Sequence, residues 1–192
     1  MDLKGHVRPL YVWEKLEAHK IFADRLDYER VRIHEAISLP DTIDLFSRKL
    51  RGMPALDQGR HNAITIGNHC FFPLFLPQEL PYPTDPADYA IGWLIHELTH
   101  AWQFQQTGWR YFFQAIWVQL RQKSRVYDLP DPDSLIQLRR DGWTFFNFSV
   151  EQQGDLTRRY YYVQRNPNRT TIEFVAYAPY IQDLIDSARS QK

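Results

Sequence analysis

Apolar residues recur along most of the chain at the three- or four-residue spacing of helices that bury one face. This spacing predicts five helical segments: 12–26, 85–108, 111–121, 148–163 and 174–188. In the last of them, Pro179 is expected to interrupt the helix or delay its start. Two shorter stretches, 28–33 and 62–67, alternate apolar and polar residues, which predicts strands, the second extending as far as Phe72. Proline and weak apolar patterning predict irregular structure over 39–59, and a loop with one helical turn over 127–141.

The helix predicted over 85–108 has clear boundary signals. Asp85 can cap its N-terminus, Pro86 suits the first helical position, and Asp88 places a negative charge in the first turn. Gly108 can end it. The pattern as a whole predicts an α+β, helix-rich fold, in which a small sheet of a few strands lies beside this long helix.

Composition favours a single folded domain over residues 1–192. Apolar residues make up 44% and aromatic residues 15% of the chain, enough for a hydrophobic core without disulfide or metal staples. Cys70 is the only cysteine, so no intrachain disulfide and no cysteine-based metal cluster can form. This cysteine usage favours a reducing compartment.

Charge and hydropathy narrow the expected partners and location. Lys and Arg total 23, as do Asp and Glu, so the formal net charge is zero and no long-range field draws nucleic acid or a membrane surface. The aromatic and basic residues over 139–169 therefore indicate buried helix faces rather than a nucleic-acid platform. The sequence lacks a membrane-spanning apolar run and a signal-peptide pattern. We expect a cytoplasmic protein, with export by a secretion system that reads no signal peptide as the alternative.

Residues His96 to His100 match the HExxH pattern of zinc enzymes. Residues four apart on a helix lie about 40° apart on one face, so both imidazoles can bind one tetrahedral zinc ion at about 2.0–2.1 Å. Glu97 is turned towards the side where a zinc-activated water would lie and can act as its general base. Surface histidines on an amphipathic helix are the alternative, but these polar residues lie within an apolar helix and would be costly without partners.

A catalytic zinc needs a third protein ligand and one open position. No histidine follows His100, and Gln106 stands where the extended HExxHxxGxxH pattern would place a third histidine. A later ligand must therefore be a carboxylate, and Glu151 is the best placed. Asp155 follows four residues later on the same helix face and can accept the free N–H of a ligand histidine.

Several alternatives and additional candidates remain open at this stage. Glu151 and Asp155 could instead form a solvated acidic face, and His61 and His69 are rival metal ligands. Gln103 lies on nearly the same helix face as the histidines and is expected either to hydrogen-bond within the site or to be a buried side chain satisfied by backbone. A hydrolase also needs a donor for the oxyanion of its tetrahedral intermediate. The sequence offers five without choosing among them: Arg158, Tyr160, Tyr161, Tyr162 and His69.

The HELTH segment followed by the ExxxD of Glu151 to Asp155 resembles the gluzincins. That resemblance implies His96, His100 and Glu151 as zinc ligands, Glu97 as general base, and Asp155 as support for a ligand histidine.

Five longer segments, in the same order, resemble a group of small bacterial zinc metallopeptidase-like proteins. This group is described as Vgr-related or Rhs-related and is associated with contractile injection systems. The segments are RPLYVWE, LDYERVRIH, AITIGNHCFF, IHELTHAWQFQ and NFSVEQQGDLTRRYY. The resemblance implies a minimal zincin-like fold, in which the strand over 63–72 runs beside the active helix and could hold a peptide by strand pairing. Gly154 departs from the expected pattern, because a better helix former is expected there.

Together these observations predict a zinc-dependent peptidase, binding one zinc ion, that acts on a peptide or protein substrate. The alternative is a binding or adaptor module of an injection or toxin system that keeps the metal as a structural element. Coordination distinguishes the two: an open position beside the 63–72 strand favours an enzyme, and a fourth protein ligand favours a structural role.

Overall fold

The computed structural model describes residues 5–37, 63–83, 85–108, 129–166, 168 and 171–187. Within these ranges the chain forms five α-helices: α1 (Val12–Phe22), α3 (Asp88–Thr107), α5 (Pro132–Arg140), α6 (Val150–Arg165) and α7 (Thr171–Asp186). Four short strands are β1 (His6–Arg8), β2 (Arg32–Glu35), β3 (Ile64–Ile66) and β4 (His69–Phe71). The fold is α+β, as the sequence pattern predicts. The predicted irregular segment 39–59 and the predicted helix 111–121 lie outside the described residues.

The strands form one mixed sheet in the order β1-β2-β4-β3. β2 pairs with β1 antiparallel and with β4 parallel, and β4 pairs with β3 antiparallel. The predicted continuation of the second strand to Phe72 is wrong, because Gly67 has a φ of 65° and the chain turns back there into β4. The first predicted strand also begins later than expected, since Tyr28–Arg30 is a short 3-10 helix.

Side chains alternate between two faces of this sheet, as the pleat of a strand requires. Ile33, Thr65 and Cys70 are buried on the inner face, which packs against α3. The outer face carries the more accessible residues, among them His34 and His69.

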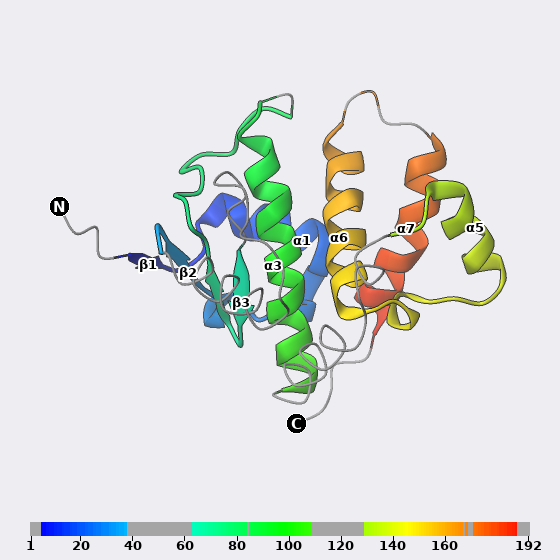
Figure 1. The fold of residues 1–192 in the computed structure, drawn as a ribbon, viewed down its shortest axis with the longest axis horizontal. Coiled ribbons are helices and arrows are strands. Elements are labelled where there is room, and N and C mark those ends of the chain that lie inside the picture. Colours follow the sequence, from blue (N-terminus) through cyan, green and yellow to red (C-terminus); the bar gives the residue numbers. More distant parts are fainter. Residues whose placement is uncertain are drawn as a thin grey trace, which may run out of the picture.

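Helix α3 is the centre of the structure (Figure 1). The sheet lies on one side of it, α6 packs on the other, and α7 and α5 follow beyond α6. α1 packs against α7. The core is aliphatic and aromatic, and its largest fully buried side chains include Phe22, Phe72, Phe145, Tyr161 and Tyr180. None of the helices in the described ranges combines the length and the apolar character that crossing a bilayer needs.

Small residues let α3 and α6 approach closely. A side chain at Gly92 would collide with the ring of Tyr162, and one at Gly154 would collide with the ring of His96. The hydroxyls of Thr99 and Thr157, from the same two helices, lie 2.7 Å apart and form a buried hydrogen bond. The two helices run antiparallel and closely packed, so residues near the middle of α3 face the first turns of α6.

Two helices differ from their sequence predictions because proline does not break them. The 127–141 segment contains α5, whose N-cap is Asp131: its carboxylate accepts a hydrogen bond from the Ser134 N–H, and Pro132 occupies the first turn. In α7, Pro179 lies inside a continuous helix that starts earlier than predicted. Two of the boundary signals of α3 are confirmed, with Asp88 in the first turn and Gly108 at the end. The other two are wrong, because the helix begins at Asp88 with Ala87 as its N-cap, so that Asp85 is not the cap and Pro86 is not the first helical residue.

A buried ion network ties the N-terminal strand to α1 and β2. The Arg8 guanidinium donates to both carboxylate oxygens of Glu14, at 2.7 and 2.9 Å, and to Glu35 Oε1 at 2.8 and 3.1 Å. All three side chains are at most 4% exposed. These contacts raise the pKa of Arg8 despite the opposing effect of burial. One cation therefore compensates two buried carboxylates.

Candidate metal centre

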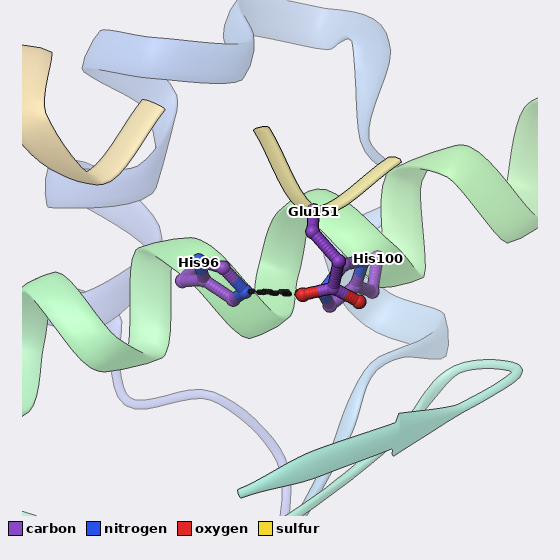
Figure 2. Close-up of side chains that lie close together, drawn as sticks. All are labelled: His96, His100 and Glu151. Atoms are coloured by element: carbon purple, nitrogen blue, oxygen red, sulfur yellow. Dashed lines mark hydrogen bonds and ion pairs between the residues drawn. The ribbon is translucent and has the colours of Figure 1, made fainter. Parts of the chain in front are cut away.

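Two adjacent helices bring three metal-binding side chains together. His96 and His100 lie one turn apart on α3, and Glu151 comes from the first turn of α6. A capping box at Ser149 and Gln152 starts α6, because each side chain accepts a hydrogen bond from the other residue's N–H. This cap fixes the turn that carries Glu151. Figure 2 shows the three side chains, which we call the His–His–Glu triad, pointing toward one another.

The spacing of the triad fits a single metal ion. The two Nε2 atoms lie 3.1 Å apart, and Glu151 Oε2 lies 3.5 Å from His96 Nε2 and 3.7 Å from His100 Nε2. A triangle with these sides has a circumradius of about 2.0 Å, so a point near its plane lies at zinc–nitrogen bonding distance from all three atoms. His96, His100 and Glu151 are the group of potential ligands found within the part of the chain that the structure describes. Three ligands leave room for a fourth, exchangeable one.

Hydrogen bonds fix the tautomer of His100. Its Nδ1 lies 2.9 Å from Gln103 Oε1, while Gln103 Nε2 donates to the Val150 carbonyl and to Gln153 Oε1. Gln153 Nε2 in turn donates to a backbone carbonyl, that of Phe148. Because carbonyls only accept, both amide orientations are determined, and the proton of His100 must be on Nδ1. Its Nε2 therefore presents a lone pair to the centre of the triad.

Gln103 thus fulfils both expectations drawn from the sequence. It hydrogen-bonds within the site, and it is a buried side chain with a backbone partner. It also connects the ligand on α3 to the first turn of α6, from which Glu151 extends. Such support orients a ligand ring and raises its affinity for metal.

Replacing Gln103 with Met is expected to lower zinc affinity by about 10–100-fold, because the ring of His100 loses the acceptor that sets its tautomer. Zinc competition against a fluorescent chelator measures this. Gln105→Met is the matched control, since Gln105 lies on the same helix but hydrogen-bonds to Asn68 and Asp27, away from the triad. Equal zinc affinity in both variants would contradict the role given to Gln103.

His96 is surrounded by negative charge. Its Nδ1 lies 3.2 Å from Asp155 Oδ1, but this buried nitrogen has no hydrogen bond of good direction. Burial lowers the pKa of His96, but the contacts with Asp155 and Glu151 and the charge of Glu97 outweigh it and raise the pKa to about 10. The pocket thus favours a positive charge at this ring, which a bound cation would supply.

With neutral histidines, the formal charges around the triad are equal in size and opposite in sign to the charge of a divalent cation. Glu97, Glu151 and Asp155 contribute three negative charges, and Arg158 contributes one positive charge through its contact of 2.7 Å with Asp155 Oδ1. The sum is −2 when the histidines are neutral. Buried charge of this kind is unfavourable unless it is paired or binds a metal. The donor set, the spacing and the charge therefore all fit one divalent ion, and two nitrogens with one carboxylate oxygen is a donor set suited to zinc.

Gly154 provides the space that the ring of His96 occupies. A Cβ atom at this position would lie 2.7 Å from His96 Cε1 and 2.8 Å from its Nδ1, closer than nonbonded carbon atoms approach. The sequence pattern marks Gly154 as a poor helix former in the middle of a helix, and the structure supplies the reason. The absent side chain allows Glu151 and Asp155 of α6 to reach the histidines.

Gly154→Ala is expected to displace His96 and weaken zinc binding by about 10-fold or more. Alanine also favours the helix by about 1 kcal/mol over glycine, so the metal-free variant should keep its fold. Isothermal titration with zinc and thermal unfolding of the metal-free form separate the two effects. Gly92→Ala is a useful comparison, since its clash is with Tyr162 rather than with a ligand. A larger loss of affinity in Gly92→Ala would show that helix spacing, not the position of His96, controls binding.

The carboxylate of Glu97 is held by the sheet. Thr65 on β3 donates its hydroxyl to Glu97 Oε2 at 2.7 Å, and both side chains are buried. The same hydroxyl lies 3.2 Å from the Glu97 carbonyl. Thr65 therefore fixes the direction of this carboxylate and links β3 to the middle of α3.

The remaining candidates from the sequence lie in different places. Of the five proposed oxyanion donors, Arg158 contacts the carboxylate of Asp155 beside the triad. Tyr162 donates to the Tyr89 carbonyl, and Tyr161 is fully buried near Arg165, where burial raises its pKa. Tyr160 packs against Phe174.

Of the two rival metal ligands, one lies away from the triad and the other is not among the described residues. His69 pairs with His34 on the outer face of the sheet instead of joining the triad. His61 lies outside the described residues.

Sequence reasoning misses two residues of this site. A threonine in a short strand gives no signal of a contact with Glu97, and Gln153 is hidden in a polar run at the start of α6.

Comparison of the chain with protein-family models, with curated proteins and with solved structures gave no significant match.

Proposed function

We propose that this protein is a zinc-dependent hydrolase of peptide or other amide bonds, with His96, His100 and Glu151 as the metal ligands. The observation that carries the proposal is the triangle of three ligand atoms, whose common centre lies at zinc-bonding distance from each. The tautomer of His100 and the net charge of the surroundings support the same ion.

The chain's own residues have distinct roles in the proposed reaction. When bound, zinc would supply a Lewis acid that polarises the substrate carbonyl and lowers the pKa of water towards neutrality. Glu97 accepts the proton of the attacking water and returns it to the leaving nitrogen. Thr65 holds this carboxylate in one direction, and Asp155 stabilises positive charge at the His96 ring.

The sheet supports a peptide as substrate. β3 is one of the two edge strands of the sheet in the described residues, and its Thr65 contacts Glu97. An extended peptide that paired with β3 would run alongside the strand that positions the general base. The number of ligands also favours an enzyme over a metal-stabilised adaptor, because the triad has three members within the described ranges.

Elemental analysis and a peptide-digestion assay test the proposal. Wild-type protein is expected to hold one zinc ion per chain and to cleave peptides in a mixture of diverse sequences, with products identified by mass spectrometry. Glu151→Ala is expected to lose stoichiometric zinc and hydrolysis together. Glu173→Ala, which removes a glutamate from the first turn of α7, is the matched control and should keep both. Zinc-loaded wild-type protein that cleaves nothing would overturn the proposed hydrolase, and zinc retained by Glu151→Ala would overturn the ligand assignment.

A further inference from the structure

A second pair of histidines lies on the outer face of the sheet. His34 on β2 and His69 on β4 come from neighbouring parallel strands, whose register pairs Arg32 with His69 and His34 with Phe71. The two histidines are therefore diagonal neighbours on one face. The opposite face carries Thr65, which contacts Glu97. The sheet thus separates this pair from the His–His–Glu triad.

The two imidazoles are in direct contact, and one ring nitrogen donates a hydrogen bond to the other. His34 Nε2 lies 2.8 Å from His69 Nδ1, and the ring centroids are 5.0 Å apart. The ring of His34 also stacks on Phe71, with centroids 4.3 Å apart and an angle of 24° between the planes. Burial and the neighbouring His69 both lower the pKa of His34, which disfavours a positive charge on its ring.

The separation of the two nitrogens suits a particular coordination geometry. Two nitrogens 2.8 Å apart subtend about 90° at an ion about 2.0 Å from each, the angle between neighbouring ligands of a square-planar or tetragonal ion. Tetrahedral zinc would need nitrogens about 3.3 Å apart. Nitrogen ligands in square-planar or tetragonal geometry are typical of copper(II) and nickel(II), and copper(II) binds most tightly of the divalent first-row ions.

We propose that His34 and His69 form a second metal site, which binds copper(II), or nickel(II) more weakly, through His34 Nε2 and His69 Nδ1. The other coordination positions would be taken by water, because no further His, Cys, Asp or Glu side chain forms a ligand group with this pair among the described residues. Such a site holds an exchangeable ion. The ion would join β2 to β4, two strands whose histidines are 35 residues apart in the chain. This inference does not depend on the proposed hydrolase.

Copper titration of zinc-loaded protein tests the site, with the zinc content measured at each step so that any copper that displaces zinc from the triad is counted separately. Electron paramagnetic resonance is expected to show one copper(II) ion per chain with two coordinated imidazole nitrogens. Removing either histidine should lower copper affinity by about tenfold or more. The ion would then be bound by one histidine, without the gain from a second ligand held nearby in the same chain. The variants are His69→Ala, which removes an exposed ring, and His34→Phe, which keeps an aromatic ring against Phe71.

His19→Ala is the matched control, since it removes another exposed histidine, on α1. It should bind copper as wild type does. Unchanged zinc content and circular dichroism in each variant show that the fold and the triad are intact. Wild-type copper affinity in both His69→Ala and His34→Phe, or a signal with only one imidazole nitrogen in the wild type, would overturn the proposal.

Discussion

Glu97→Gln is expected to lower the rate of peptide hydrolysis by about 10²–10⁴-fold while leaving one zinc ion per chain. The reason is that an amide cannot accept the proton of the attacking water. Glutamine has nearly the same shape as glutamate, and its carbonyl oxygen can still accept the hydrogen bond that Thr65 donates to Glu97 Oε2. The fold and the ligand triad should therefore be undisturbed. Steady-state kinetics on a peptide identified in the digestion assay, together with elemental analysis, measure both quantities.

The matched control for this variant is Glu79→Gln, which makes the same change at an exposed position in the segment before α3. It should show wild-type kinetics. If Glu97→Gln retained hydrolysis within about threefold of wild type with full zinc occupancy, Glu97 would not be the general base and another group would have to accept the proton. If zinc were lost as well, the carboxylate would be needed to build the site rather than for proton transfer.

Arg8→Met is expected to lower the free energy of unfolding by about 3–5 kcal/mol. Methionine fills much of the volume of arginine, but it leaves the carboxylates of Glu14 and Glu35 buried without the guanidinium that donates to both. Removing one partner of a buried ion network costs far more than the network contributes as a whole, because the remaining charges stay desolvated. Urea unfolding of the metal-free protein gives the free energy directly.

Lys15→Met is the control for this stability prediction. Lys15 pairs with Glu29, whose side chain is 78% exposed, so we expect a change below about 1 kcal/mol. A loss of less than about 1 kcal/mol in Arg8→Met would mean that the two carboxylates regain water or bind protons at little cost. The triple variant Arg8→Met, Glu14→Gln, Glu35→Gln should recover part of the stability, because it removes the uncompensated charges together.

The sequence predicts the pairing of the two histidines in the triad well because helix geometry alone relates them. His96 and His100 are one turn apart in any helix, and the cap at Ser149 is visible from its sequence, so α6 and the position of Glu151 in its first turn can be read locally. The convergence of the two helices is a tertiary property. Only the departure at Gly154 signals it in advance, and its meaning becomes clear when the ring of His96 is found against it.

Errors in the predicted fold come from residues with two structural uses. Pro132 favours a loop by its residue type, but proline after an N-cap aspartate also starts a helix, and α5 begins there. Gly67 was read as a residue within a strand, whereas its positive φ turns the chain into β4. The contact between Thr65 and Glu97 depends on how the sheet packs on α3, for which a three-residue strand holds no periodic signal.

The origin of the three proposed ligands on two separate helices has a consequence for the order in which the protein would acquire a metal ion. The imidazoles of His96 and His100 are within reach of each other as soon as α3 forms, whereas the carboxylate of Glu151 arrives only when α6 has docked against it. A chain still being folded would thus hold a zinc ion by two contacts at most, and weakly. Tight binding would therefore come last, and a bound ion would then oppose the separation of α3 from α6 and stabilise the finished fold.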